Sequence, residues 1–76
     1  MYRVIKICGL TSTEDARAAV LMGADILGMV MHQRSPRYCS PSRAFDISRD
    51  FYFRPRVFVF ADDEIEYAQY LLGEFS

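Results

Sequence analysis

The sequence is poor in the residues that mark extracellular, metal-binding and membrane proteins. Its 76 residues include two cysteines, Cys8 and Cys39, and one histidine, His32, and their positions lack the short spacing of a zinc site. A disulfide framework is equally unfavoured, so we expect reduced thiols in a cytoplasmic protein. The chain has no apolar run of about 18 residues and no leader pattern before its first apolar segment, so we expect no membrane span and no export.

An excess of one charge is also missing. Nine basic and ten acidic residues leave a net charge of -1, and the basic residues form no continuous run. Binding to nucleic acid or to an anionic membrane therefore has no electrostatic support. Neither a Gly-rich dinucleotide fingerprint nor a P-loop motif occurs.

Apolar residues, in contrast, are plentiful for so short a chain. Hydrophobic residues make up 51% of the sequence, with six Phe and five Tyr. A chain of this size buries only about 60% of its unfolded surface, so we expect marginal stability. The apolar content further predicts a surface that something outside this segment covers.

Three strand-helix units organise the chain. Apolar segments at 4–8, 26–31 and 57–61 predict buried strands that start about 23 to 30 residues apart. That spacing is typical of βα units, so we expect a parallel sheet with helices on one face. Gly28, inside the second segment, indicates close approach by a side chain or a substrate.

Helix-start signals follow each of these segments. They are Thr11 with Glu14, Ser40 with Pro41, and Asp62 or Asp63 with Glu66. Gly23 is placed to end the first helix in a left-handed conformation. The residues expected to face the core are Ala16, Ala19 and Val20, then Ala44, Ile47 and Phe51, then Ile65, Ala68, Leu72 and Phe75.

The end of the first strand carries a candidate reactive group. Because side chains alternate along a strand, Lys6 and Cys8 share one face, opposite Ile5 and Ile7. Reactive groups of α/β enzymes lie at the carboxyl ends of such strands. The same pattern also fits an inert structural thiol beside a lysine that reaches solvent.

The loop at 32–39 follows the second strand and is polar and basic. His32, Arg34 and Arg37 with Tyr38 are typical of an anion-recognition loop. A solvated connection with ordinary charges is the alternative, and His32 alone is expected to be simply exposed.

Two motifs, KICGLT at 6–11 and SPRY at 35–38 followed by Ser40-Pro41, resemble the amino-terminal part of the phosphoribosylanthranilate isomerase family. The resemblance implies an α/β fold, a (βα)8 TIM barrel of which residues 1–76 form a single incomplete segment of about three βα units. It implies an isomerase of tryptophan biosynthesis that converts N-(5'-phosphoribosyl)anthranilate to 1-(2-carboxyphenylamino)-1-deoxyribulose 5-phosphate. This Amadori rearrangement of a phosphorylated small molecule uses no metal and no organic cofactor.

The resemblance also implies roles for three residues. Cys8 matches the general base that removes the C2' proton from a ring-opened Schiff base, and Lys6 faces the substrate and favours the thiolate. Arg37 matches the arginine that holds the anthranilate carboxylate, for which a bidentate guanidinium is suited. The family's general acid and phosphate-binding loops belong to later strands, so no residue of this chain is assigned to them.

The chain departs from the family pattern at several positions. His32 and Gln33 replace an aromatic residue and a proline, Cys39 replaces an aliphatic residue, Phe58 replaces a glycine and Asp62 replaces an asparagine. The bulk of Phe58 is expected to alter packing near the barrel interior.

Other interpretations of the chain remain open. We expect it to be inactive or incomplete on its own, as a fragment or truncated form that needs the missing carboxyl-terminal units. The alternative is a non-catalytic remnant or βα module that self-associates through its open strand edges. An unrelated small α/β domain that shares the pattern by chance is a third interpretation.

Overall fold

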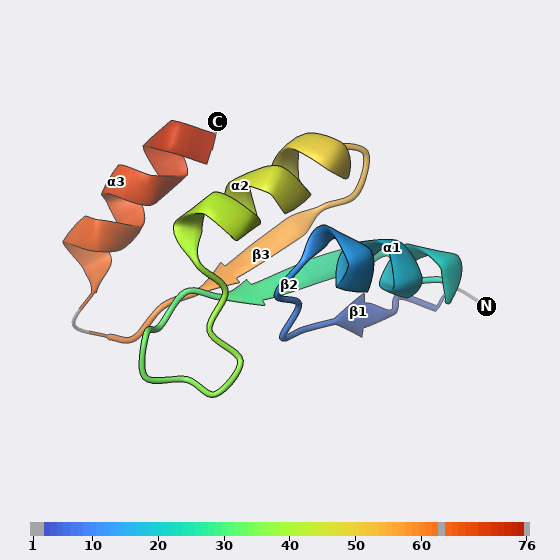
Figure 1. The fold of residues 1–76 in the computed structure, drawn as a ribbon, viewed down its shortest axis with the longest axis horizontal. Coiled ribbons are helices and arrows are strands. Elements are labelled where there is room, and N and C mark those ends of the chain that lie inside the picture. The colour runs from blue at the N-terminus through green and yellow to red at the C-terminus, as the bar shows by residue number, and fades with distance from the viewer. Residues whose placement is uncertain (1–2, 63, 76) are drawn as a thin grey trace.

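The fold alternates strands and helices along the whole chain (Figure 1). A computed structural model describes residues 3–62 and 64–75. The elements are β1 (Lys6–Ile7), α1 (Thr13–Leu21), β2 (Ile26–Val30), α2 (Pro41–Asp50), β3 (Arg56–Val59) and α3 (Ile65–Phe75). The strands form one parallel sheet in the order β1-β2-β3, which confirms the predicted α/β class and the three βα units.

One hydrophobic core joins the helices to the sheet. It includes Leu27 and Met29 of β2, Ala16 of α1, Ile47 of α2 and Leu71 of α3. Because all three helices contribute to the core that covers one side of β2, they form a single layer on that face. α1 packs against α2, and α2 packs against α3.

The register of the strands decides which side chains meet the helices. Leu27 pairs with Arg56, and Met29 pairs with Phe58, so these positions share the helix-facing side. Phe58 is half-buried and packs against the core. The expectation that it alters packing near the barrel interior is therefore wrong, because alternation turns its ring toward the helical layer.

Helix α1 begins later than its predicted cap. Ser12, not Thr11, is the N-cap, and its hydroxyl oxygen accepts a hydrogen bond from the backbone N–H of Asp15 at 3.1 Å. Leu10 explains the shift, since its side chain is buried in the core and its N–H donates to the carbonyl oxygen of Gly28 at 3.1 Å. The chain thus extends along β2 for longer before the helix starts. Gly23 has a φ of 99°, as predicted for the end of this helix.

Helix α2 follows its sequence signals closely. Ser40 is the N-cap, its hydroxyl oxygen accepts from the Arg43 N–H at 3.4 Å, and Pro41 is the first helical residue. The three residues predicted to face the core are all buried there.

Helix α3 presents a different face from the predicted one. Ile65 is 67% exposed and Leu72 is 42% exposed, whereas Leu71 is buried and Tyr67 is half-buried against the core. The helix begins at Ile65, and a rotation of one residue brings the Tyr67 and Leu71 positions inward. Asp63 lies outside the described residues, and so does the side chain of Phe75.

Only the central strand is buried as predicted. Leu27, Gly28 and Met29 of β2 are buried, but Val4 before β1 is 70% exposed and Val59 at the end of β3 is 40% exposed. Among the described residues, β2 alone has a hydrogen-bonded strand on each side, and composition does not distinguish a central strand from an edge strand. The predicted burial of the outer two strands is therefore wrong, and both are shorter than predicted.

Within residues 3–62 and 64–75, no helix combines the length and the apolar character that a membrane crossing requires.

Gly28 provides a test of this packing. A Cβ at Gly28 lies 2.9 Å from Cys8 Sγ and 3.1 Å from Cys8 Cα, so Gly28→Ala forces β1 away from β2. We expect a loss of about 1–3 kcal/mol in the free energy of unfolding, measured by urea denaturation. Gly73→Ala is the control, because a Cβ there meets no atom within 4 Å. An alanine in helix α3 is expected to be neutral or stabilising by up to about 1 kcal/mol. A Gly28→Ala chain as stable as the parent contradicts the close approach.

Candidate active site at the carboxyl ends of the strands

Cys8 lies beyond the end of β1 on the face of the sheet that the helices leave open. Its side chain is exposed, and its sulfur lies directly over Gly28 of the neighbouring strand. The close approach predicted at Gly28 is confirmed, and the approaching group is the Cys8 side chain. The thiol is therefore not the buried structural group that its residue type alone favours.

Arg37 reaches the same end of the sheet from the loop after β2. Gly9 has a φ of +84°, and a Cβ on it lies 2.7 Å from Arg37 Cδ and 3.0 Å from Arg37 Nη1. The guanidinium of Arg37 thus lies over the residue that follows Cys8. A glycine at position 9 allows the left-handed backbone conformation and also leaves space for the Arg37 side chain.

Lys6 completes the set of predicted site residues. It pairs with Ile26 in the register of β1 with β2, is exposed, and shares the face of Cys8 by strand alternation. The structure therefore brings Cys8 and Arg37 to one end of the sheet and leaves Lys6 two residues earlier along the same strand face.

Consecutive turns shape the loop that carries Arg37. The Ser35 N–H donates to the His32 carbonyl oxygen at 3.0 Å, and the Tyr38 N–H donates to the Ser35 carbonyl oxygen at 3.1 Å. Ser35 Oγ accepts from the Arg37 N–H at 3.1 Å. The loop then returns to the sheet, where the Cys39 N–H donates to the Val30 carbonyl oxygen at 2.8 Å. The loop is thus a hydrogen-bonded connection with exposed charged side chains at Arg34 and Arg37.

His32 and Glu64 join the loop after β2 to the segment after β3. His32 Nδ1 lies 3.2 Å from Glu64 Oε1, and the same oxygen accepts a hydrogen bond from the Ala61 N–H at 2.8 Å. Both side chains are partly buried, so the expectation that His32 is simply exposed is wrong. The Ala61 N–H, and secondarily His32, hold the pKa of the Glu64 carboxyl below its ordinary value. No sequence motif marked Glu64, because its partner lies 32 positions away.

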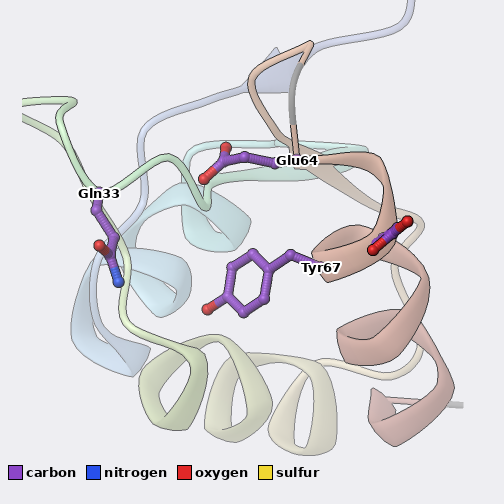
Figure 2. Close-up of a pocket in the computed structure, with 4 residues that line it drawn as sticks. Gln33, Glu64 and Tyr67 are labelled. Carbon is purple, nitrogen blue, oxygen red and sulfur yellow. The ribbon is translucent and has the colours of Figure 1, made fainter.

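Tyr67 lies beside this pair on α3. A hollow of about 400 Å³ is lined by Gln33, Glu64, Glu66 and Tyr67. Figure 2 shows the Tyr67 ring reaching from α3 toward the segment of Gln33, with Glu64 nearby. Burial raises the pKa of the Tyr67 phenol, and interactions with Tyr38 and Glu64 raise it further. Tyr67 was expected neither in the core nor near the site, since neighbouring Ala68 fits the simple helical spacing better.

The described residues contain no group of three or more His, Cys, Asp or Glu side chains suited to hold a metal ion.

The sequence and the structure are similar to those of phosphoribosylanthranilate isomerases. No family model matches the sequence. The N-(5'-phosphoribosyl)anthranilate isomerase of Geobacter sp. strain M21 is 45% identical over 64 residues, which cover 83% of this chain and 31% of the relative. The crystal structure of phosphoribosylanthranilate isomerase from Thermotoga maritima superposes with a TM-score of 0.88 at 39% identity, over 97% of this chain and 37% of that chain. The chain matches the amino-terminal part of the phosphoribosylanthranilate isomerase family.

A second crystal structure of a phosphoribosylanthranilate isomerase holds reduced 1-(o-carboxyphenylamino)-1-deoxyribulose 5-phosphate. It matches with a TM-score of 0.88 at 39% identity and covers 97% of this chain and 39% of that chain. This chain therefore spans about a third of the length of the phosphoribosylanthranilate isomerases that it matches. An unrelated domain that shares the pattern by chance is excluded.

The two thiols provide a test of the site geometry. Cys8 is exposed, whereas Cys39 is fully buried and burial raises its pKa, which keeps it protonated. We expect Cys8 to react with a disulfide reagent at least about tenfold faster than Cys39 in the native chain. Mass spectrometry of quenched samples measures both rates. In the Cys8→Ser variant, only the slow reaction of Cys39 is expected to remain. Equal rates without denaturant contradict the structure.

The Glu64 carboxyl predicts a pH dependence of stability. Because its pKa is lowered on folding, the carboxylate stabilises the folded chain fully above the ordinary pKa of 4.5. That contribution is lost as the pH falls through the lower pKa of the folded state. We therefore expect the difference in urea midpoint between the parent and Glu64→Gln to narrow from pH 6 toward pH 3. A difference that stays constant over this range contradicts the lowered pKa.

Proposed function

We propose that this chain supplies the proton-abstracting and carboxylate-binding part of a phosphoribosylanthranilate isomerase, with Cys8 as the general base. Arg37 binds the anthranilate carboxylate, and Lys6 faces the phosphorylated substrate. The observation that carries the proposal is the position of the Arg37 guanidinium over Gly9, next to Cys8. Two motifs separated by nearly 30 residues of sequence thus meet at one end of the sheet.

The chemistry follows from these positions. The Cys8 thiolate takes the C2' proton of the ring-opened Schiff base, and the electron pair of the C2'–H bond forms a double bond between C1' and C2'. The π electrons of the C1'=N double bond move to the nitrogen of the protonated Schiff base while the C1'–N single bond remains, which gives a neutral enolamine that tautomerises to the aminoketose. Arg37 holds the aromatic carboxylate during this transfer, because two parallel N–H···O bonds fix both distance and angle.

The remaining requirements of the reaction have no residue assigned in this chain. A general acid and a phosphate-binding loop are needed, and proton transfer and positioning each contribute about 10²-fold or more in rate. We infer that carboxyl-terminal barrel units supply them, as the matched isomerases are about three times longer. A cytoplasmic location suits the two free thiols, Cys8 and Cys39.

One observation favours a second candidate function, a βα module that binds a second copy of itself. The sheet face opposite the helices carries Val57 and Val59, and no described element covers it. β1 and β3 are open edges of the described sheet, which are able to pair with another chain. Such a module retains the fold without the reaction.

A chimaeric barrel tests the enzymatic proposal. Residues 1–76 replace the matched segment of the Thermotoga maritima isomerase, and loss of phosphoribosylanthranilate fluorescence measures turnover. We expect Cys8→Ser to lower kcat by about 10²-fold or more, because it removes the base. Arg37→Met is expected to lower kcat/KM by about 10- to 100-fold through loss of a charge-assisted hydrogen-bond pair. Arg34→Met, on the same loop, is the control and is expected to change kcat/KM less than about twofold.

Turnover by the chimaera and the solution mass of the unfused chain separate the two candidates. A chimaera that turns over substrate only with Cys8 intact supports the isomerase. A folded chimaera without turnover, together with a chain that is a dimer or larger at all concentrations, contradicts it and favours the self-associating module.

A further inference from the structure

We propose that Glu64, just before α3, and Tyr67, in its first turn, are positioning residues that hold the Arg37 side chain over Gly9, the residue next to Cys8. The inference rests on the proposed role of Arg37 and adds residues that no motif of the family resemblance contains. The loop at 32–39 is approached by the residue that precedes α3 and by the first turn of that helix. Glu64 Oε1 lies 3.2 Å from Nδ1 of its first residue, His32, and Tyr67 shares a hollow with Gln33 and interacts with Tyr38, which is adjacent to Arg37.

The first contact fixes the start of the loop. Glu64 Oε1 is itself held by the Ala61 N–H at 2.8 Å, and the Glu64 N–H donates back to the Ala61 carbonyl oxygen at 3.0 Å. These two bonds close a tight turn between β3 and α3. The Glu64 carboxylate is therefore a rigid acceptor, and His32 Nδ1 meets it at 3.2 Å.

The second contact fixes the end of the loop. The Tyr67 ring packs edge-on against Phe60, with ring centroids 6.1 Å apart and an interplanar angle of 87°. Its phenol interacts with the phenol of Tyr38. Figure 2 shows the Tyr67 side chain pointing from α3 toward this loop. The Tyr67 ring is half-buried and packed against Phe60, which restricts the positions that its phenol can take beside the loop.

Between the two contacts, hydrogen-bonded turns connect the ends of the loop to the backbone of Arg37 and so restrain its position. The His32 carbonyl oxygen accepts a hydrogen bond from the Ser35 N–H. Ser35 in turn accepts hydrogen bonds from the N–H groups of Arg37, through its hydroxyl oxygen, and of Tyr38, through its carbonyl oxygen. Arg37 thus sits in a short segment whose two ends are tied to α3, while its side chain extends over Gly9. Fixing a long charged side chain on a ligand costs conformational entropy. A backbone that is already held in place reduces the part of this cost that remains when the ligand binds.

The reactivity of Cys8 reports the position of the Arg37 guanidinium without any isomerase activity. The full 76-residue chain is treated at low ionic strength with 5,5'-dithiobis(2-nitrobenzoate), a dianion, or with neutral 4,4'-dithiodipyridine. A guanidinium near Cys8 raises the rate with the dianion relative to the neutral reagent. We expect Arg37→Met to lower this rate ratio about threefold, by removing one nearby positive charge.

The double variant Glu64→Gln/Tyr67→Phe tests the two positioning residues. We expect it to lower the same ratio by about twofold or more, because the guanidinium is less often near Cys8. Removal of the Glu64 negative charge by itself acts in the opposite direction and raises the ratio. The matched control is Glu66→Gln/Tyr70→Phe, which makes the same chemical changes at exposed positions of the same helix. The control is expected to leave the ratio at or slightly above the parent value.

Buried Cys39 separates displacement of the loop from loss of folding. A variant that only destabilises the chain speeds the reaction of Cys39 with both reagents and leaves the Cys8 ratio unchanged. If Cys39 becomes reactive in the double variant, the Cys8 rate ratio of each single variant, Glu64→Gln and Tyr67→Phe, is compared with that of the parent instead. A Cys8 ratio equal to or above that of the parent in all three variants overturns the positioning role. The proposed function is tested separately by the Arg37→Met effect and by the chimaera assay, so that result does not contradict it.

Discussion

The approach of β1 to β2 at Gly28 is the constraint on which the rest of the site depends. With no side chain at position 28, Cys8 lies across the neighbouring strand and the Leu10 N–H reaches the Gly28 carbonyl oxygen. That contact delays the start of α1 and fixes the left-handed turn at Gly9. The vacant space over Gly9 then accommodates Arg37 from the next loop. Two positions without side chains thus determine where the Cys8 thiol and the Arg37 guanidinium lie.

Local signals predicted most of the architecture because they act within one element. Ser40 and Pro41 start α2 as predicted, and Gly23 ends α1 with a positive φ, since capping chemistry involves only neighbouring residues. Strand alternation likewise predicted that Lys6 and Cys8 share a face. The Thr11 cap was wrong because the burial of Leu10, which sets the start of α1, is a tertiary effect.

The remaining features depend on contacts between distant segments, which a single sequence does not encode as a visible pattern. His32 and Glu64 are separated by 32 positions, and their pairing follows from the adjacency of β2 and β3. The inward face of α3 depends on how the helix docks on α2, so spacing alone favoured Ile65 over Tyr67. The family resemblance, in contrast, already predicted that the end of β1 and the loop after β2 belong to one site. The reason is that both motifs, KICGLT and SPRY, occur in the sequence at the spacing found in the family.

Strand order equals chain order in this sheet, and every pairing joins consecutive units. Within the described sheet, β2 and β3 each pair with the strand synthesised just before them. Sequential pairing of this kind makes vectorial folding during translation a direct outcome of the topology.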